Sequence, residues 1–505
     1  MTPKMTEASS VSVYLVGAGP GDPGLITLRG VEILRRADVV LYDFLVNPLI
    51  LSHAPANTQR ICLGRHGQGR LLPQDEINEM LVGFAKQGKI VVRLKGGDPA
   101  VFARVAEETE ALAAAGVQWE IVPGITAALA AGSYAGIPLT HRDHTSAVAL
   151  VTGQEQKDGG ESKLDYNSIA RFPGTLAIYM GVTTARKWTQ ALIAAGRHPT
   201  TPAVIVRRCS WSDQVVIGCR LETIADELEG RNLRPPVLVM IGAGCEVTEE
   251  LSWFTRRPLV GQTVLVTRPE HQAYEMCRSL TEFGAGCLLQ PAIEISPPVD
   301  WSPVDAALRQ LDRYHWLVFS SANGVRFLLE RICQQHGDLR RLGTIRLAAI
   351  GPGTANELAK YHLHADLLPT AYRAEALAEA LADDAAGQRF LLARASRGRE
   401  VLRELLESAG GSVDQVVVYQ SQDVAQPSEQ IAEMMATDRI DWITVTSSAI
   451  ARSVVKLFGE QLRNVRIASI SPLTSATLRD SGYDPAVEAD EYTIDGIIAA
   501  IMKSV

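Results

Sequence analysis

Short apolar runs alternate with helix-like segments along the whole chain. Each run is rich in Val, Ile, Leu and Ala and ends at, or directly before, Gly, Pro, Ser or Asp. The runs are VSVYLVG, ADVVLYD, KIVVRLKGG, SAVALVTG and TLAIYMG in the first half, and QTVLVTRP, HWLVFSS, IRLAAIG, RFLLARA, VDQVVVYQ, DWITVTSS and VRIASIS in the second. Strands that are buried on both faces of a parallel sheet show this pattern. The sequence therefore predicts an α/β protein with parallel sheets and crossover helices.

The segment SWFTRRPLVG, residues 252–261, predicts a boundary between two halves. A new strand and helix begin directly after it, at Gln262. A chain of 505 residues exceeds the size at which one hydrophobic core keeps growing, so several domains are expected.

The second half contains an internal repeat. Residues 316–322 align with 442–448, and residues 349–358 align with 469–478. A duplicated strand–helix–strand–helix unit predicts two similar lobes, whose ligand site lies at the carboxyl ends of their strands. The Ser- and Thr-rich loops at these ends offer hydroxyls and helix amides that suit carboxylates or phosphates. The alternative is that the hydroxyls only cap the helices that follow.

Composition and charge narrow the class of protein. The chain is 46% apolar and 21% charged, with a net charge of −8 and no long run of Lys or Arg. This argues against nucleic acid or an anionic membrane as the main partner. The seven cysteines are scattered without a CxxC pair, which favours reduced thiols in a cytoplasmic protein over disulfides or a metal site. We see no signal segment and no membrane-spanning run, and we expect no metal.

The segment VYLVGAGPGDPGLITLRG resembles a dinucleotide-binding loop at first sight. That fingerprint needs a third glycine where Asp22 stands, and Pro20 has no N–H group for a pyrophosphate. The loop therefore favours a ligand without phosphates. Asp43 ends the next strand and resembles a ribose-binding acid, so a nicotinamide oxidoreductase remains as a weak alternative.

Three further segments have the composition of a ligand site. In KGGDP, Gly96 and Gly97 let the backbone approach a flat ligand, and Asp98 can cap a helix or accept from a ribose. The segment PGIT opens a helix of small residues that permits close approach. Met180 ends another strand, where it can pack on an adenine or simply belong to the core.

These segments, together with VPGIT, AGIPLTHR, VTG and IYMG, resemble the uroporphyrinogen-III C-methyltransferases of the tetrapyrrole methylase family over about residues 11–250. The resemblance implies two α/β subdomains, 11–123 and 124–252, in a homodimer that binds S-adenosyl-L-methionine between them and releases S-adenosyl-L-homocysteine. It implies donor contacts from Pro20, Gly96, Gly97, Asp98, Val101, Thr126, Ala127, Met180, Cys209 and Gly242.

The resemblance also implies residues for the tetrapyrrole substrate. Asp43, Leu45 and Phe102 match positions tied to substrate binding or turnover. The substrate carries carboxylates, so Arg65, Arg142 and Arg104 are candidate cationic contacts, together with His141. Arg104 is also a candidate to assist proton removal, although arginine almost never deprotonates. The segment GGDPAVFARVAEE lacks Gly and Phe positions of the family, and Gln154 replaces a histidine; both departures concern pocket shape and turnover.

The second half resembles uroporphyrinogen-III synthase over about residues 260–505. The resemblance rests on GQTVLVTRP, FSSANGV, AAIGPGTA, LLARA, RELLESAGGSVDQVVVY, WITVTSS, SISPLTSATL and EYTIDGI, with Ser471 in place of a glycine. It implies two flavodoxin-like lobes: residues 260–298 with 423–505, and residues 299–422. It implies that Tyr419 assists departure of a hydroxyl, and that carboxylates are bound by Ser320, Ser321, Asn323, Thr354, Ser447, Ser448 and Thr474.

The two resemblances together predict a bifunctional enzyme of tetrapyrrole biosynthesis. The second half would close hydroxymethylbilane to uroporphyrinogen III, and the first half would methylate that product twice to give precorrin-2. Two alternatives remain for the first half. It could methylate a later cobalt-precorrin, or it could be a non-catalytic module that binds a tetrapyrrole or the methyl donor.

Overall fold

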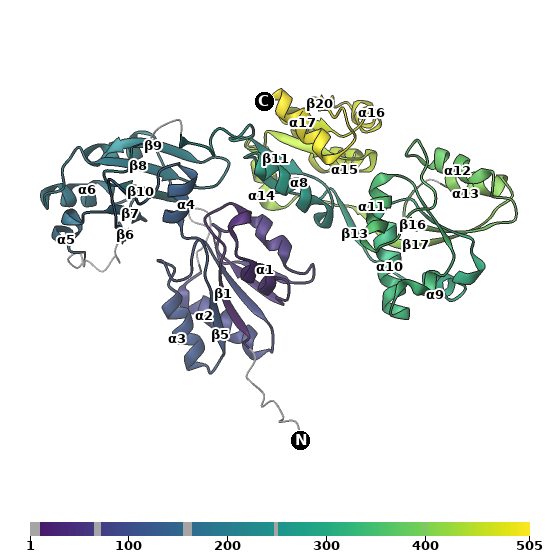
Figure 1. The fold of residues 1–505 in the computed structure, drawn as a ribbon, viewed down its shortest axis with the longest axis horizontal. Helices are drawn as coiled ribbons and strands as arrows, with labels where there is room; N and C mark the ends of the chain where they lie inside the picture. Colours follow the sequence, from purple (N-terminus) through teal and green to yellow (C-terminus); the bar gives the residue numbers. More distant parts are fainter. Residues whose placement is uncertain (1–10, 65–71, 155–163, 247–250, 399) are drawn as a thin grey trace, which may run out of the picture. The chain divides into compact units, whose positions relative to one another are not determined.

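The fold is seen in a computed structural model that describes residues 11–64, 72–154, 164–246, 251–398 and 400–505 (Figure 1). It contains four five-stranded sheets with helices packed on them, which confirms the α/β class. The chain forms two compact units: Met1–Gln290 with Ser428–Val505, and Pro291–Pro427. The first unit holds three of the sheets and the second unit holds one.

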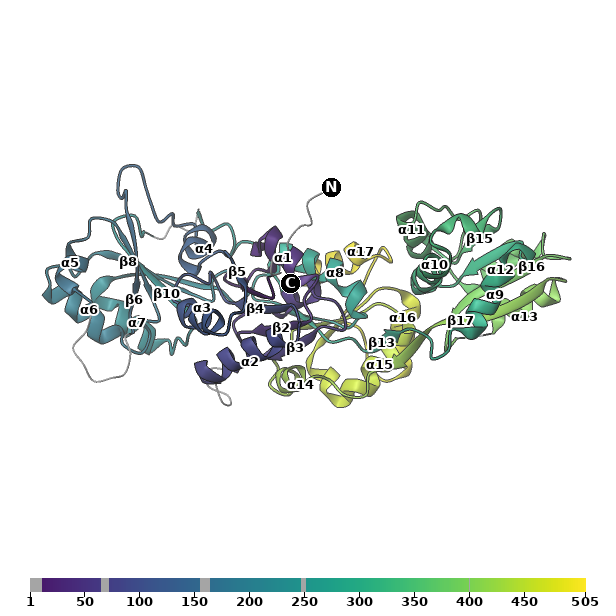
Figure 2. The ribbon, with the colours of Figure 1, turned by 90° about the horizontal axis from the view of Figure 1, so that it is seen from below.

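The first sheet is parallel, in the order β3-β2-β4-β1-β5. Its strands are β1 (Val13–Gly17), β2 (Val39–Tyr42), β3 (Gln59–Cys62), β4 (Val91–Lys95) and β5 (Trp119–Val122). The helix α1 (Leu28–Leu34) packs on one face, and α2 (Gln74–Lys86) and α3 (Val105–Ala114) pack on the other (Figure 2). All residues of β1 and β4 are buried, as expected for strands covered on both faces.

The second sheet has the order β6-β7-β10-β8-β9. Its strands are β6 (Val148–Thr152), β7 (Thr175–Tyr179), β8 (Pro202–Arg207), β9 (Val215–Arg220) and β10 (Val237–Ile241). Only β6 and β7 pair in parallel, so the prediction of a parallel sheet is wrong here. The short connection between β8 and β9 permits a hairpin, and an apolar run reads the same in either direction. Helix α4 (Ala127–Tyr134) covers one face, and α5 (Tyr166–Arg171), α6 (Ala185–Ala194) and α7 (Ile224–Gly230) cover the other.

The third sheet is parallel and is built from both ends of the second half. Its order is β12-β11-β18-β19-β20. The strands are β11 (Thr263–Val266), β12 (Gly286–Leu289), β18 (Trp442–Val445), β19 (Arg466–Ser469) and β20 (Val487–Glu488). The helices of this lobe are α8 (Glu270–Glu282), α14 (Glu429–Ala436), α15 (Ser448–Phe458), α16 (Pro472–Asp480) and α17 (Ile494–Ser504). Since β11 pairs directly with β18, the lobe is discontinuous in sequence.

The fourth sheet has the order β13-β17-β16-β14-β15. Its strands are β13 (Ile293–Ser296), β14 (Trp316–Phe319), β15 (Arg346–Ala349), β16 (Arg389–Ala395) and β17 (Ser412–Asp423). Helices α9 (Ser302–Arg309), α10 (Ala322–His336) and α11 (Pro352–Lys360) pack on one face, and α12 (Ala374–Ala382) and α13 (Val401–Ser408) on the other. Because β13 pairs with β17, the unit begins at Pro291 and ends at Pro427, a wider span than the predicted 299–422.

Short 3-10 helices complete the described elements: η1 (Pro23–Leu25), η2 (Pro48–His53), η3 (Leu221–Thr223), η5 (Leu311–Arg313), η6 (Leu339–Leu342) and η7 (Gly459–Asn464). The internal repeat is confirmed, because β14-α10-β15-α11 and β18-α15-β19-α16 follow in the same order on adjacent parallel strands.

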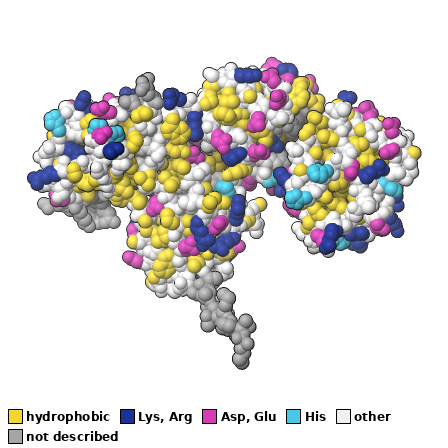
Figure 3. All heavy atoms as spheres, in the orientation of Figure 1, with side chains coloured by type: hydrophobic (Ala, Val, Ile, Leu, Met, Phe, Trp, Pro, Cys, Tyr) yellow, Lys and Arg dark blue, Asp and Glu magenta, His cyan; other side chains and the backbone are white. Residues whose placement is uncertain are grey.

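Within the described residues, no helix is both long and apolar enough to cross a membrane, and no three His, Cys, Asp or Glu side chains gather as metal ligands would. The seven cysteines are free thiols. On the face shown in Figure 3, Lys and Arg side chains lie scattered among Asp and Glu and among hydrophobic atoms.

Candidate active sites

Three loops meet at the carboxyl edge of the first sheet. They follow β1, β4 and β5, and contain the segments GAGPGD, GGDP and PGIT. The first two loops are joined by backbone hydrogen bonds, in which Gly19 N donates to Gly97 O at 3.1 Å and Gly97 N donates to Gly19 O at 2.8 Å. A Cβ atom on Gly124 would lie 2.3 Å from Gly97 O and 2.7 Å from Gly17 Cα. The third loop can therefore approach the other two only as glycine.

Asp98 ties the second loop to the third. Its Oδ1 atom accepts from Ala100 N at 2.8 Å, and its Oδ2 atom accepts from Gly124 N at 2.9 Å. Each carboxylate oxygen keeps a further lone pair, so a ligand hydroxyl can still be accepted. Asp98, which is predicted to contact the methyl donor, thus also holds the second and third loops together.

Tyr179 brings the second sheet to this edge. Its hydroxyl accepts from Ala128 N at 2.9 Å and shares a hydrogen bond of 2.8 Å with Thr126 Oγ1. Its ring lies 5.0 Å from the ring of Phe102. Burial raises the pKa of Tyr179, so the hydroxyl stays protonated at neutral pH. The sequence signal for this residue is its place at a strand end beside Met180.

Three of the predicted site residues have left-handed backbone conformations. The φ angles are +52° at Phe102 and +53° at both Arg104 and Met180. Such conformations are unfavourable for residues with a Cβ atom and concentrate at functional sites. The side chains of Met180, Phe102 and Leu45 are exposed by 48, 43 and 37%, so they offer an apolar surface to a ligand. Leu45 lies beside Gly96, since a Cβ atom on that glycine would be 3.6 Å from Leu45 Cβ.

The glycine loop is held from the second subdomain. Asp22 N donates to Ser210 Oγ at 2.9 Å, and Trp211 Nε1 donates to Pro20 O at 3.1 Å. Gly21 has a φ of +159°, and a Cβ atom there would lie 2.2 Å from the indole nitrogen of Trp211. Sequence reasoning missed Ser210 and Trp211, although a tryptophan in a polar loop between two strands was an available signal.

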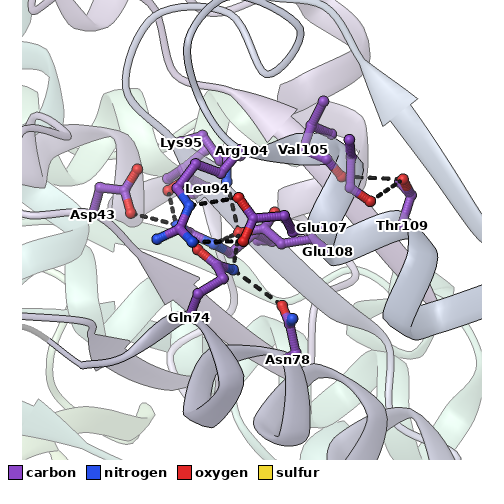
Figure 4. A network of polar contacts seen from close by, with 12 residues as sticks. Asp43, Gln74, Asn78, Leu94, Lys95, Arg104, Val105, Glu107, Glu108 and Thr109 are labelled. Carbon is purple, nitrogen blue, oxygen red and sulfur yellow. Dashed lines mark hydrogen bonds and ion pairs between the residues drawn. The ribbon is translucent and has the colours of Figure 1, made fainter. Parts of the chain in front are cut away.

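Asp43 directly follows β2, beside these loops, and is paired with a buried arginine. Its Oδ1 atom lies 2.6 Å from an Nη2 atom of Arg93, and the Asp43 side chain is 35% exposed (Figure 4). Arg93 in turn contacts Glu108, which also binds Lys95. These three partners were missed as well. For Arg93 and Lys95 the signal was the presence of charged residues inside the apolar run KIVVRLKGG, whereas Glu108 lies outside that run.

Arg104 pairs with Glu107 through Nε, at 2.7 Å, and is largely exposed. The hydrogen bond that Arg104 donates to Glu107 raises the pKa of Arg104. The guanidinium therefore keeps its charge, which suits a carboxylate contact and argues against a role in proton removal.

The structure does not bring every predicted residue to this edge. Gly242 follows β10 at the opposite end of the second sheet, because Ile241 pairs with Leu176 while Leu238 pairs with Tyr179. Cys209 directly precedes Ser210, which holds the glycine loop, but its own side chain is 7% exposed and packs in the core beside α4. Arg142 is exposed in a turn closed by a hydrogen bond from His141 N to Thr145 O. Arg65 lies outside the described residues.

The remaining predicted donor contacts are local to the loops. Val101 and Ala127 are partly buried, next to the GGDP segment and at the start of α4. Thr126 is 8% exposed and is already bonded to Tyr179. Pro20, Gly96, Gly97, Asp98, Val101, Thr126, Ala127 and Met180 therefore border the edge where the three loops and Tyr179 meet.

Tyr419 lies in the second unit, in contact with Ser321, which is one of the predicted carboxylate-binding residues. Its hydroxyl is 3.0 Å from Ser321 Oγ, and the residue is 7% exposed. A register shift between β16 and β17 places Tyr419 opposite Ala395. Burial raises the pKa of Tyr419, whereas its hydrogen bonds with Ser321 and Asn323 lower it. The tyrosine therefore remains a proton donor at neutral pH.

The predicted Ser and Thr contacts fall into two groups. Ser321 Oγ accepts from Gly324 N, and Ser447 Oγ accepts from Ile450 N, so both are helix caps at equivalent positions of the repeat. Ser320 is exposed and Ser448 is partly exposed.

The other three residues are buried. Thr354, Thr474 and Asn323 are only 5, 1 and 9% exposed. Their burial argues against direct contact of these side chains with a ligand, whereas helix capping is observed for Ser321 and Ser447.

Comparisons with known proteins match each half of the chain to a protein family. Residues 12–225 match the family model of the tetrapyrrole (corrin/porphyrin) methylases, and residues 275–499 match that of uroporphyrinogen-III synthase HemD. Porphyrin biosynthesis protein HemD of Ruminiclostridium josui is 31% identical over 488 residues, which cover 96% of this chain and 95% of that protein.

Two other proteins resemble the chain in part. Uroporphyrinogen-III C-methyltransferase of Bacillus subtilis is 37% identical, over 69% of this chain and 71% of that protein. The crystal structure of uroporphyrin-III C-methyl transferase from Thermus thermophilus, complexed with S-adenyl homocysteine, has 40% identity, covers 47% of this chain and 99% of its own, and gives a TM-score of 0.41. With both halves matched, the chain belongs to the porphyrin-biosynthesis proteins in which a tetrapyrrole methylase is followed by a uroporphyrinogen-III synthase.

Proposed function

We propose that the chain carries out two consecutive steps of tetrapyrrole biosynthesis. The C-terminal half closes hydroxymethylbilane to uroporphyrinogen III, with inversion of ring D and loss of water. The N-terminal half then transfers two methyl groups from S-adenosylmethionine to give precorrin-2. The observation that supports the second step most directly is the meeting of three glycine-containing loops with Asp43, Phe102 and Met180 at one sheet edge.

The residues at this edge fit a flat, positively charged donor. When bound, S-adenosylmethionine supplies an electrophilic methyl group on a sulfonium. Backbone glycines let it approach the loops, and the exposed side chains of Met180 and Phe102 offer apolar contact. Asp98 can accept from a hydroxyl, as argued above. Methylation of an electron-rich ring carbon demands little acid–base chemistry, so alignment and exclusion of water are the main contributions of these residues.

The synthase step needs a proton for a departing hydroxyl. Tyr419, protonated and held by Ser321, is our candidate donor. As the carbon–oxygen bond breaks, the hydroxyl leaves as water and the electrons of a pyrrole stabilise the carbon that remains. The larger task is to hold a flexible chain of four rings in one shape, which is an entropic contribution.

The assembly and location are also proposals. We propose a homodimer formed through the N-terminal half, in the cytoplasm, which acts on small tetrapyrroles without nucleic acid or membrane. The support is the family of the first half and the seven free thiols, which suit a reducing compartment.

A coupled assay tests the proposal. The purified chain is supplied with hydroxymethylbilane and S-adenosylmethionine, and the product is followed by mass spectrometry. The proposal expects uroporphyrinogen III with two added methyl groups. Methylation of a cobalt-precorrin, but not of uroporphyrinogen III, would favour a later pathway step. Binding of S-adenosylhomocysteine without any methyl transfer would favour a non-catalytic module, for which the altered GGDPAVFARVAEE segment is the motivation.

A further inference from the structure

Three charged side chains are buried under the loops of the N-terminal site. Arg93 and Lys95 lie two residues apart on β4 and are 4 and 2% exposed, while Glu108 on α3 is fully buried (Figure 4). Side chains two residues apart on a strand share one face of the sheet, here the face packed against α2 and α3. The cluster is therefore part of the subdomain core.

Glu108 is the centre of this cluster. Its Oε1 atom accepts from Lys95 Nζ at 2.6 Å, from Arg93 Nε at 3.1 Å and from Gln74 Nε2 at 3.3 Å. The second oxygen, Oε2, is buried and has no hydrogen-bond partner. Two buried cations thus share one buried carboxylate.

Asp43 supplies the second negative charge. The guanidinium of Arg93 is divided among three partners: Nε contacts Glu108, Nη1 donates to Leu94 O at 3.2 Å, and Nη2 lies 2.6 Å from Asp43 Oδ1. A planar guanidinium with all three nitrogens engaged has one orientation. Asp43 N also donates to Leu94 O, so the backbone of this residue is fixed to β4 as well.

Stability does not account for such a cluster. Buried ion pairs lose several kcal/mol per ion in desolvation, and apolar residues of similar volume are often as stabilising. Asp43 is the member that reaches the surface, at 35% exposure, and it does so beside Leu45 and the GGDP loop. The buried contacts between Arg93 and Glu108 thus connect the core of the subdomain to the Asp43 carboxylate in the candidate site.

We infer that Arg93, fixed by Glu108, is a positioning residue that holds the Asp43 carboxylate in one orientation at the methyl-transfer site. The inference rests on the proposed methyl transfer. It gives Asp43 the role of a fixed negative charge facing the reacting groups. Lys95 completes the charge balance, with two cations against two carboxylates.

Variants at Arg93 and Glu108 test this role. R93K keeps the positive charge and loses the planar fork, and E108Q keeps an acceptor oxygen and loses the charge. We expect each to lower kcat for methylation between about tenfold and 100-fold, as small misplacements at a reacting centre do. The dissociation constant of S-adenosylhomocysteine should change less than about threefold if the loops remain in place.

A matched control is available in the same subdomain. Arg29 pairs with Glu120 through Nε at 3.0 Å and Nη2 at 2.8 Å, in an exposed ion pair that shares no residue with the Arg93 cluster. R29K should leave methylation unchanged. The synthase activity of each purified variant reports whether its C-terminal half is correctly folded.

A double-mutant cycle with D43N separates positioning from structure. In the D43N background R93K should have little further effect, read in kcat or, if turnover is too slow, in the dissociation constant of the fluorescent porphyrin formed by oxidation of the substrate. Equal effects of R93K with and without D43N would overturn the inference, as would a parallel loss of S-adenosylhomocysteine binding. If the unaltered chain does not methylate uroporphyrinogen III, the proposed function fails instead.

Discussion

The hydroxyl of Tyr134 donates a hydrogen bond to Asp22 Oδ2 at 2.8 Å, from a residue 112 positions further along the chain. The other oxygen of the carboxylate accepts from Gly24 N at 2.8 Å. Burial raises the pKa of Tyr134, so it remains the donor. Asp22, which replaces the third glycine of the dinucleotide fingerprint, therefore stabilises the loop by hydrogen bonds to both of its carboxylate oxygens.

Replacing Tyr134 by Phe should loosen the glycine loop. A hydrogen bond to a charged group contributes about 1.5–3 kcal/mol, so kcat/KM for methylation should fall at least about tenfold. Synthase activity should not change. Y14F is the matched control, because the buried Tyr14 hydroxyl accepts from Arg36 away from the loops, at 3.0 Å. An equal loss in both variants would show a general effect on the subdomain.

A methyl group at Gly124 should separate the three loops. The added carbon would lie 2.3 Å from Gly97 O, and backbone cannot yield as a flexible side chain does. We expect G124A to weaken S-adenosylhomocysteine binding by roughly tenfold or more, measured by calorimetry. G83A is the control, since a Cβ atom there meets nothing within 4 Å in helix α2. Unchanged binding of S-adenosylhomocysteine in G124A would show that the three loops do not form the binding site of the methyl donor.

Tyr419 should act only in the synthase step. Y419F is expected to lower the rate of ring closure by about 100-fold, as removal of a general acid does, and to leave methylation of added uroporphyrinogen III unchanged. A similar loss in both activities would point to misfolding.

The pH dependence of the synthase step tests the same tyrosine. Burial raises the pKa of Tyr419, so its proton is retained to higher pH than in a free tyrosine, whose pKa is about 10. The hydrogen bond from Ser321 lowers this pKa, so its loss in S321A should move the alkaline limb of the rate profile upward. A downward shift would contradict the assignment.

Asp305 and Arg331 join α9 to α10 by two hydrogen bonds, of 2.8 and 2.6 Å. Arg331 lowers the pKa of Asp305 below its unfolded value of about 3.9. The stabilisation is therefore present above about pH 4 and is lost as the pH falls through the lower, folded pKa. D305N should destabilise these helices by about 1 kcal/mol at neutral pH and flatten the acid dependence, measured by hydrogen exchange of α9 and α10.

Much of the fold could be predicted because buried strands are readable as apolar runs. The repeat and the α/β class both depend on that signal. The direction of β8 and β10 could not be predicted, since an apolar run does not encode its partner. The limit at Pro291 was missed because the pairing of β13 with β17 joins residues far apart in sequence.

The residues of the candidate sites also differ in how far they could be predicted from the sequence. The role of the glycines and Asp98 in joining the loops could be predicted, because few other residues serve tight turns and backbone contacts; their role as ligand contacts stays a prediction. Ser321 and Ser447 were ambiguous, since one hydroxyl can cap a helix or bind a ligand. Arg93 and Glu108 were missed because their significance lies in a contact between a strand and a helix, which the spacing of charges alone does not reveal.

The order β12-β11-β18-β19-β20 also has a consequence for synthesis of the chain on the ribosome. When Pro427 has been added, the first two sheets and the second unit have all their strands, but β11 has only β12 beside it. The last residues, 428–505, supply three of the five strands. Until they emerge, an apolar parallel edge stays open to other nascent chains. A premature stop near codon 428 would therefore leave the first two sheets with all their strands and still give a chain prone to aggregate.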